Sequence, residues 1–239
     1  MSAEARRKVT AGQYLLIDAD DTLWENNIYF ERAIANFISF LNHHEFTPDQ
    51  VREALYDVER ENIRRHGYGI DSFALALVRC FEHLSVEPLT PALHDTIRGF
   101  AYVIAEHPME ILPDVPETLA DLAKRHRLIL VTKGNITEQS GKVERSGLKE
   151  YFTAVEVVAE KDAATYTGVV EKYGLPREST WMIGNSPKSD INPALEAGLH
   201  AVFVPHHNTW MLERDDLRPE IGDGRLLQVE SFGRLREVF

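Results

Sequence analysis

Hydrophobic residues along this chain follow two different patterns. Tyr14–Ile17 is an unbroken apolar run that ends in acidic residues, which is typical of a strand buried on both faces of a parallel sheet. From about residue 28 to residue 106 the apolar positions recur at helical spacing instead, with no convincing strand pattern. The chain therefore predicts one strand followed by a long helical block.

Four helices are expected within this block. The first carries an apolar stripe formed by Phe30, Ile34, Phe37, Ile38 and Leu41. Pro48 opens the second helix, the third covers residues 73–81, and Pro91 opens the fourth, because proline fits the first turn of a helix.

Downstream of Pro113 the pattern changes again, and short apolar strands alternate with helices. We expect helices at residues 115–126, 136–146, 163–173 and 191–197, and strands at residues 128–132, 154–158, 181–184 and 201–204. The sequence thus predicts a parallel α/β core whose first strand is separated from the others by an inserted helical domain.

Composition and charge narrow the possible partners. With 239 residues, of which 44% are hydrophobic, the chain is long enough to bury a sizeable core. Its formal net charge of −12 disfavours nonspecific attraction to nucleic acids and to anionic membranes. We therefore expect neither nucleic acid nor membrane as a partner, and an anionic substrate needs a local site that bears a cation.

Cysteine usage and apolar run lengths bear on the compartment. Cys80 is the only cysteine, so no disulfide can form within the chain, and a reducing compartment fits. Residues 1–11 are charged and lack the apolar centre of a signal peptide, and no later run is long enough to span a bilayer. We expect a cytoplasmic protein that is a monomer or a small homo-oligomer.

Polar side chains follow four of the predicted strands. Since the loops at the carboxyl ends of parallel strands converge, these side chains are candidates for one shared site. The groups, in chain order, are Asp18, Asp20, Asp21 and Thr22, then Thr132, Lys133, Gly134 and Asn135, then Lys161 and Asp162, then Asn185, Ser186 and Asp190.

This constellation suits phosphoryl transfer. Asp18 and Asp20 are two residues apart and can face one phosphorus atom, Asp18 as nucleophile and Asp20, held partly protonated, as general acid and base. Lys161 would neutralise the charge gathered there. The hydroxyl group of Thr132 and the amides of Lys133 and Gly134 would form a phosphate nest. Asp190 and the amide oxygen of Asn185 offer the hard ligands that Mg²⁺ prefers.

Each of these pieces also has an ordinary structural explanation. An acidic cluster after a strand is often a solvated loop, Gly134 and Asn135 can simply form a turn, and most lysines solvate the surface. The segment 184–190 can be an ordinary entry to a helix. Their order along the chain and their common position at strand ends favour the functional interpretation.

The residues 18–22, Thr132, Lys161 and 184–190 resemble, in order, the four motifs of the haloacid dehalogenase (HAD) superfamily. The resemblance implies that Asp18 is the nucleophile, that Asp20 is the general acid and base, and that Asp18, the Asp20 carbonyl and an acid of the fourth motif bind the metal. It also implies a Rossmann-like core at residues 1–24 and 108–239, and an all-α helical cap at residues 25–107 that closes over the site and chooses the substrate.

Two positions depart from the family pattern. The fourth motif usually begins Gly-Asp, whereas this chain has Asn185, a neutral ligand that should weaken metal binding. Asp21 stands where glycine is common and adds negative charge at the site mouth.

The sequence therefore predicts a magnesium-dependent phosphatase. It would hydrolyse a small phosphorylated metabolite, such as a sugar phosphate or a nucleotide, through an aspartyl-phosphate on Asp18. A phosphomutase or a dehalogenase of the same superfamily, a receiver domain, and a catalytically weak regulatory or binding protein are the alternatives. The dehalogenases lack the second acid, here Asp20, and receiver domains are about half as long and have no helical insert.

Residues that would select the substrate are harder to identify. Aromatic and amide residues close behind the nucleophile can line the entrance or belong to a core: Trp24, Asn26, Asn27, Tyr29 and Phe30. Arg64, Arg65 and His66 can meet a second anionic group or solvate a helix end. His206 and His207, with Trp210 nearby, suggest a rim or a metal site, but no acid stands beside them at ligand spacing in the sequence.

Overall fold

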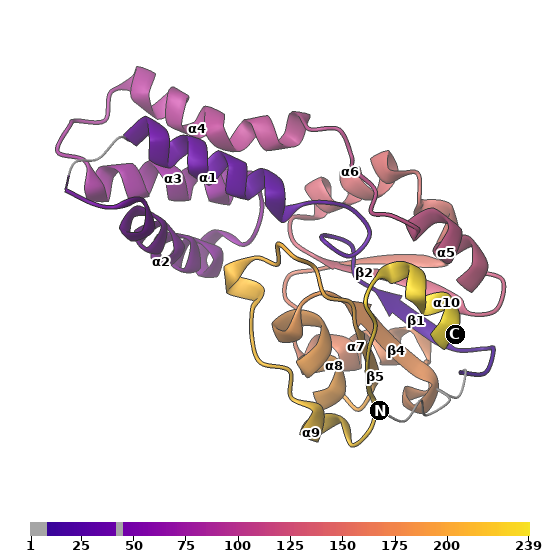
Figure 1. Cartoon of the computed structure of the whole chain (residues 1–239). Helices are drawn as coiled ribbons and strands as arrows, with labels where there is room; N and C mark the ends of the chain where they lie inside the picture. Colours follow the sequence, from indigo (N-terminus) through magenta and orange to yellow (C-terminus); the bar gives the residue numbers. More distant parts are fainter. Residues whose placement is uncertain (1–8, 42–44) are drawn as a thin grey trace. The chain divides into compact units, whose positions relative to one another are not determined.

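The computed structural model describes residues 9–41 and 45–239. Most of the charged segment 1–11 discussed above lies outside these residues. The chain forms two compact units: unit 1 comprises Met1–Glu25 and Met109–Phe239, and unit 2 comprises Asn26–Pro108 (Figure 1). Within the described ranges, no helix combines the length and the hydropathy needed to cross a membrane.

Unit 1 is built on a parallel sheet, which confirms the predicted fold class. The described residues form six strands in the order β3-β2-β1-β4-β5-β6, so that the strand before Asp18 is central. The strands are β1 (Tyr14–Ile17), β2 (Arg127–Lys133), β3 (Ala154–Val158), β4 (Thr180–Gly184), β5 (His200–Phe203) and β6 (Leu226–Gln228).

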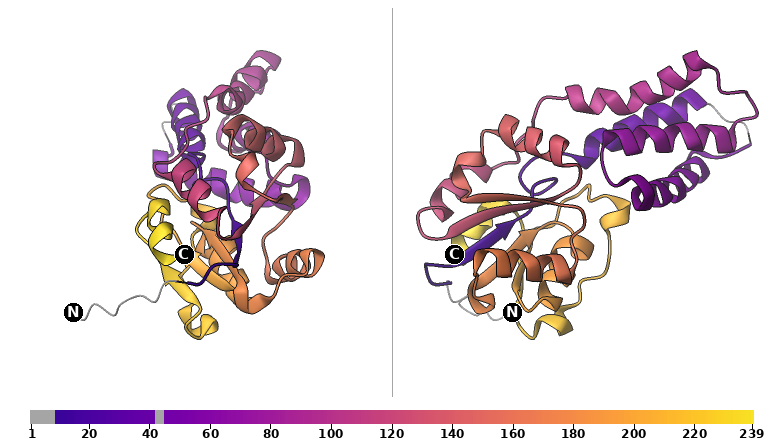
Figure 2. Two further views of the ribbon diagram at one scale, coloured as in Figure 1. Left: turned by 90° about the vertical axis from the view of Figure 1, so that its right-hand side faces the viewer. Right: turned by 180° about the vertical axis from the view of Figure 1, so that it is seen from behind.

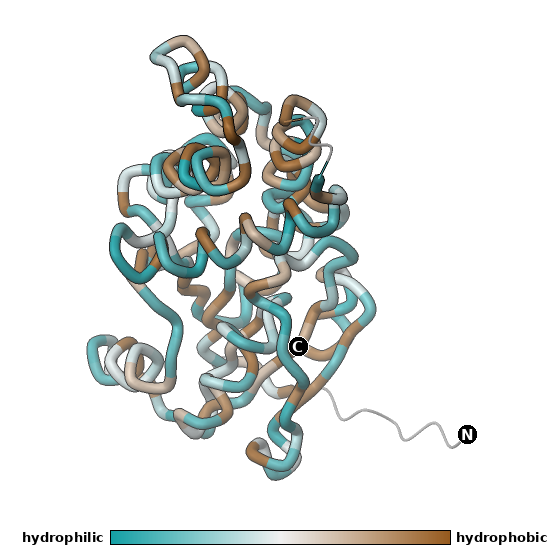
Figure 3. The backbone as a smooth tube through the Cα atoms, turned by 90° about the vertical axis from the view of Figure 1, so that its left-hand side faces the viewer, coloured by the Kyte–Doolittle hydropathy of each residue, from teal (hydrophilic) through white to brown (hydrophobic). Residues whose placement is uncertain are grey.

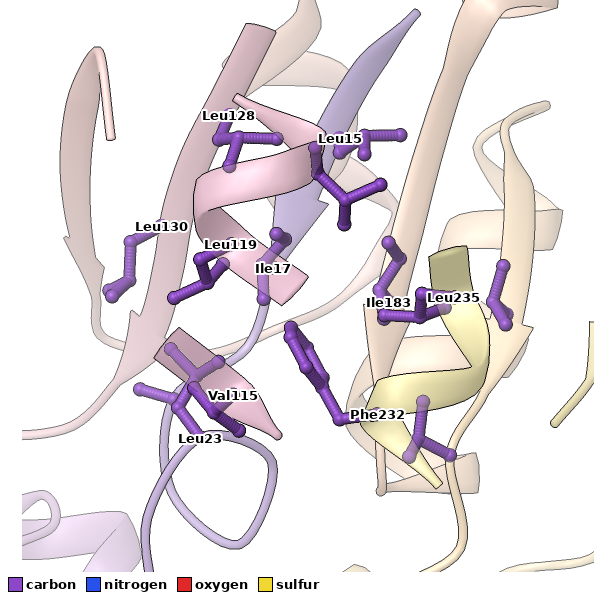
Figure 4. Close-up of a cluster of buried hydrophobic side chains, with 14 of the residues drawn as sticks. Leu15, Ile17, Leu23, Val115, Leu119, Leu128, Leu130, Ile183, Phe232 and Leu235 are labelled. Carbon is purple, nitrogen blue, oxygen red and sulfur yellow. The ribbon is translucent and has the colours of Figure 1, made fainter. Parts of the chain in front are cut away.

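Helices cover both faces of this sheet (Figures 1 and 2). Along β1, Leu15 and Ile17 face one side and Leu16 faces the other, as the two-residue period of a strand requires. The first face packs on α5 (Val115–Leu122) and α10 (Leu235–Val238), and the close-up in Figure 4 shows these side chains together. The second packs on α7 (Ala163–Tyr173) and α8 (Asn192–Glu196).

The remaining helices of unit 1 are short or connect strands. They are α6 (Ile136–Ser146), α9 (Pro219–Gly222), the 3₁₀ turns Lys149–Tyr151, Arg177–Ser179, Met211–Glu213 and Phe232–Arg234, and a π turn at Pro187–Ile191. Asn135 caps α6 and Asp162 caps α7, each accepting backbone N–H groups through its side chain. Two of the loops that carry candidate site residues are therefore fixed by helix caps.

Three elements differ from the sequence prediction. The helix expected at 115–126 ends at Leu122, because the chain must turn before Arg127 to enter β2, and the Gly12 N–H bonds the Arg125 carbonyl (2.8 Å). The helix expected at 191–197 is short and follows the π turn. Strand β6 was not predicted, because three residues are too few to show a period.

Unit 2 consists, within its described residues, of four helices: α1 (Asn27–Leu41), α2 (Pro48–His66), α3 (Ile70–Leu84) and α4 (Pro91–Glu106). Thr47 and Gln50 form a capping box at the start of α2, and Thr90 caps α4. The tube in Figure 3 shows hydrophobic and hydrophilic residues interspersed along the chain, and the apolar sides of the four helices form a core that includes Phe37 and Leu77. The prediction of four amphipathic helices is confirmed.

The two places where the chain leaves and re-enters unit 1 lie side by side. The Glu25 N–H bonds the Glu110 carbonyl (2.9 Å), and the Leu112 N–H bonds the Leu23 carbonyl (2.9 Å). Trp24 and Ile111 form an antiparallel bridge between these bonds. A short two-stranded neck thus closes unit 1 where unit 2 is inserted.

Candidate active site

Three of the predicted residues meet at the carboxyl end of the sheet. Lys161 Nζ lies 2.5 Å from Asp18 Oδ1 and 2.7 Å from Asp190 Oδ1. All three side chains are buried, although Lys161 is 143 residues from Asp18 in sequence. The structure therefore brings together the expected nucleophile, the expected cation and the acid of the fourth segment.

The charges of this triad do not balance. Burial and the neighbouring Asp18 carboxylate raise the pKa of Asp190 to about 7, against the attraction of Lys161. Burial alone would lower the pKa of Lys161, but attraction to Asp18 and Asp190 outweighs burial and raises it well above its usual value. Two acids against one ammonium group leave room for a cation.

Asn185 presents its side-chain oxygen to the same place. The Thr22 hydroxyl donates to Asp18 Oδ2 (2.9 Å) and lies 3.3 Å from Asn185 Oδ1. The Asn185 amide nitrogen donates to the Thr209 hydroxyl (3.3 Å), which orients the oxygen toward Asp18. Two buried carboxylates and one amide oxygen are hard donors of the kind that bind Mg²⁺. The residues present fit that ion.

Gly184 is required by the position of Asp190. A Cβ atom at residue 184 would lie 2.2 Å from Asp190 Oδ2, well inside van der Waals contact. The same carboxylate oxygen accepts the Ser186 N–H (2.9 Å). The end of β4 thus wraps around the Asp190 carboxylate, and any side chain at Gly184 would displace it.

Asp20 lies in a separate polar cluster. Its carboxylate accepts from Lys142 Nζ (2.8 Å), Trp24 Nε1 (2.7 Å) and Gln139 Nε2 (2.9 Å). Burial favours the neutral acid, but the charge and hydrogen bond of Lys142 and the other donors outweigh it and lower the pKa of Asp20. This arrangement favours the carboxylate form of Asp20, contrary to the expectation that Asp20 is held partly protonated.

Gln139 and Lys142 were missed in the sequence. Both lie on α6, three residues apart and hence on the same side of the helix, and α6 begins directly after the Thr132 segment. The three-residue spacing of Gln139 and Lys142 indicates that they share one side of α6. The sequence does not show that this side faces Asp20, which is 122 residues from Lys142.

The backbone N–H of Gly134, one of the two amides expected in the phosphate nest at residues 132–134, is not available as predicted. The Gly134 N–H is already bonded to the Val158 carbonyl (3.0 Å), since β2 and β3 pair up to this point. Lys133 Nζ is bound by Glu213 (2.7 Å) and by Glu160 (3.1 Å). The Thr132 hydroxyl lies 3.3 Å from Gln139 Oε1. Thr132 keeps a place beside the site, whereas the side chain of Lys133 is engaged by acids.

The other candidates are divided between the units. In unit 1, Trp24 is buried and bonded to Asp20. In unit 2, Tyr29 stacks on His107 with ring centroids 4.4 Å apart. Arg65 pairs with Glu61 (2.6 Å) at the exposed end of α2, where solvation explains it. His206 follows β5 in unit 1, beside Glu25.

Comparison with known proteins shows the family of this chain. The model of the haloacid dehalogenase-like hydrolase family matches residues 13–198, which include Asp18, Asp20, Thr132, Lys161 and Asp190. The chain belongs to this family.

Individual relatives cover both units. The chain is 23% identical over 236 residues to the Escherichia coli 5-amino-6-(5-phospho-D-ribitylamino)uracil phosphatase YigB, covering 91% of this chain and 94% of that protein. It is 25% identical over 213 residues to the Streptococcus pneumoniae pyrimidine 5'-nucleotidase PynA (82% and 85%). The crystal structure of a haloacid dehalogenase-like family hydrolase from Xanthomonas campestris superposes with a TM-score of 0.80 at 30% identity, covering 98% and 94%.

Proposed function

We propose that this protein is a magnesium-dependent phosphatase that hydrolyses a small phosphorylated metabolite through an aspartyl-phosphate on Asp18. The observation that carries the proposal is the buried triad, in which Lys161 lies within 2.7 Å of both Asp18 and Asp190. Ionised Asp18 beside a fixed cation is an activated nucleophile. The named activities of the similar E. coli and S. pneumoniae proteins, a phosphatase and a nucleotidase, support the same reaction class.

The reaction divides into two displacements at phosphorus. An Asp18 oxygen attacks the phosphorus atom, the ester P–O bond breaks, and the leaving oxygen takes a proton from Asp20. Water then attacks the phosphorus atom and gives its proton to Asp20. The acyl phosphate bond breaks, which releases inorganic phosphate and restores Asp18. Lys161 offsets negative charge near the nucleophile in both steps.

Magnesium would be held by the carboxylates of Asp18 and Asp190, the backbone carbonyl of Asp20 and the side-chain oxygen of Asn185. When bound, it neutralises phosphoryl oxygens and orients the substrate. The side chain of Asn185 carries no charge. We therefore expect this site to bind Mg²⁺ more weakly than the same site with a carboxylate at position 185.

Asp20 begins the first step from an unfavourable state. Its ion pair with Lys142 (2.8 Å) stabilises the carboxylate, which suits the base role in the second step. To act as the acid it must hold a proton, and a protonated Asp20 gains little from Lys142. We therefore propose that the negative charge of the bound substrate favours protonation of Asp20. The protonated side chain then leaves its ion pair with Lys142 and can donate to the leaving oxygen.

The substrate is proposed only as a class. YigB and PynA are named for nucleotide-related phosphate esters, and sugar phosphates and nucleotides therefore lead the candidates. The single, buried Cys80 fits a reducing compartment, so we propose a cytoplasmic enzyme, monomeric or a small homo-oligomer.

A panel of phosphorylated metabolites, assayed for inorganic phosphate with Mg²⁺ and with EDTA, tests the proposal. We expect release from at least one nucleotide or sugar phosphate with Mg²⁺ and loss of release with EDTA. The Asp18→Asn variant serves as the matched control for contaminating phosphatases. Equal release by that variant, or no release across the panel, would contradict the proposal.

A further inference from the structure

Two imidazoles and one carboxylate converge in unit 1 outside the triad described above. His206 and His207 follow β5, and Glu25 ends the loop that begins at Asp18. The ligand atoms of these three residues all lie within 4.8 Å of one another. Adjacent side chains usually diverge, but here the two imidazole rings lie on the same side, with centroids 4.5 Å apart. The acid that the sequence did not show beside the histidines is supplied by a residue 181 positions earlier in the numbering, Glu25 against His206.

The closest contact in this cluster has the spacing of two ligands on one ion. His206 Nε2 lies 3.4 Å from Glu25 Oε2. A tetrahedral Zn²⁺ ion with bonds of about 2.0–2.2 Å places neighbouring ligand atoms about 3.3–3.6 Å apart. The observed separation therefore matches one edge of such a tetrahedron.

Beyond this mutual contact, both atoms are unsatisfied. Among the described residues, neither His206 Nε2 nor Glu25 Oε2 makes a well-formed hydrogen bond, although both atoms are buried. The His206 side chain is only 7% exposed. Buried polar atoms without partners are costly, and a cation between the two would satisfy both at once.

The surroundings of the other ring nitrogen, His206 Nδ1, are also compatible with metal binding through Nε2. Metal-bound histidines usually donate the N–H of their other nitrogen to a carboxylate or carbonyl group. His206 Nδ1 lies 3.9 Å from Asp21 Oδ1, within a small movement of such a bond. Nδ1 also accepts the Asn208 N–H at 3.3 Å, a contact that belongs to the tautomer with its proton on Nε2. The two tautomers distinguish a metal site from a simple histidine–glutamate contact.

We propose that Glu25, His206 and His207 form a transition-metal site with Zn²⁺ as the cation of matching chemistry. The two imidazole ligands favour Zn²⁺ over Mg²⁺, so the site differs in chemistry from the oxygen-only set around Asp18. Three protein ligands leave a fourth position open for water or another ligand. The ion would join the loop that starts at Asp18 to the loop that holds Asn185 through Thr209.

Zn²⁺ titration of the metal-stripped full chain, by calorimetry in excess Mg²⁺, tests this proposal. The Mg²⁺ occupies oxygen sites, so Zn²⁺ should bind with a stoichiometry of one. Because His207 is exposed, His207→Ala should fold normally and weaken Zn²⁺ binding by more than about 10-fold, the lower end of what losing even an outer partner costs. Glu25→Gln should do the same, whereas His94→Ala, at an exposed position on α4, should bind like wild type.

Imidazole ¹⁵N spectra of wild type provide a second measurement that needs no variant. One equivalent of Zn²⁺ should shift the ring nitrogens of His206 and His207, place the proton of His206 on Nδ1, and leave His94 unchanged. Equal Zn²⁺ affinity in wild type and His207→Ala, or no shift at His206 and His207, would overturn the site.

Discussion

Both units bury carboxylates, but they compensate the charges differently. In unit 1, Asp18 and Asp190 share Lys161 at 2.5 and 2.7 Å. In unit 2, Glu59 is buried, and its Oε2 has no hydrogen-bond partner among the described residues. Arg52, whose positive charge favours the ionised form of Glu59, is already paired with Glu31 at 2.5 Å. Unit 1 therefore pairs its buried acids with a buried cation, whereas unit 2 leaves the buried carboxyl group of Glu59 without one.

This difference separates chemistry from stability. Burial, with a smaller contribution from Glu31, raises the pKa of Glu59 to about 8, so the group stays protonated near neutral pH. A neutral acid can be replaced without loss of a charge. In the triad of Asp18, Lys161 and Asp190, the charges take part in the proposed reaction. Replacing any one of these residues therefore changes the electrostatic environment of the other two.

The largest effect is expected for Asp18→Asn. Removing the nucleophile should lower kcat by roughly 10⁴-fold or more. Lys161 keeps Asp190 at 2.7 Å, and the repulsion between the two acids disappears, so the melting temperature should hold or rise. Activity and thermal unfolding are measured together, with the exposed Asp57→Asn as control. Near-normal turnover in Asp18→Asn would remove the proposed nucleophile.

Glu59→Gln tests the other side of the comparison. The folded state keeps the Glu59 proton up to about pH 8, while the unfolded state releases it near 4.5. Wild-type stability therefore falls as pH rises through this window. Above pH 8 the variant should be more stable than wild type, by up to about 5 kcal/mol, and the advantage should vanish near pH 4.5.

Urea unfolding of wild type and Glu59→Gln between pH 4.5 and 9 checks this prediction, because their difference isolates one group. Glu53→Gln, at an exposed position of the same helix, controls for loss of a carboxylate. A difference that does not change with pH would show that Glu59 is ionised when folded. Phosphatase activity should be unaffected in either variant.

Lys142→Met tests the role of Asp20, whose carboxylate is paired with Lys142. Without the charge and hydrogen bond of Lys142 the pKa of Asp20 should rise. If protonated Asp20 starts the reaction, the limb on which kcat/KM falls with rising pH should move upward by the same amount. Lys172→Met, which removes an exposed lysine paired with Glu156 at 2.7 Å, is the control. An unmoved limb would separate Asp20 from the observed pH dependence.

The smallest effect is expected for Asn185→Asp. The added charge next to Asp18 should tighten Mg²⁺ binding by about tenfold if the side-chain oxygen is a ligand. Mg²⁺ titration of activity measures the change, and Asn36→Asp, exposed on α1, adds the same charge elsewhere. Identical Mg²⁺ curves for wild type and Asn185→Asp would exclude residue 185 from the metal site.

Features with a local cause were predictable from the sequence. The run at β1 is apolar because both faces of the strand are covered, and the helices of unit 2 show their period because one side of each is buried. The strand-end position of Asp18, Lys161 and Asp190 followed from the same pattern. Their convergence is a property of parallel sheets rather than of any one residue.

Features with a distant cause were not predictable. The ionisation of Asp20 depends on Lys142, and the availability of the Gly134 N–H depends on how far β2 pairs with β3. Glu25 and His206 meet only because two loops end at the same edge of unit 1. Such pairings are set by tertiary packing, which spacing along the sequence does not encode.

The two-stranded neck between Leu23–Glu25 and Glu110–Leu112 has an evolutionary consequence. The chain leaves and re-enters unit 1 through adjacent hydrogen-bonded backbone segments. In terms of topology, the inserted unit is therefore equivalent to the loop of a β-hairpin. Lengthening, shortening or replacing such a loop leaves every strand register intact. Lineages can therefore exchange one inserted module for another while the catalytic scaffold is inherited unchanged.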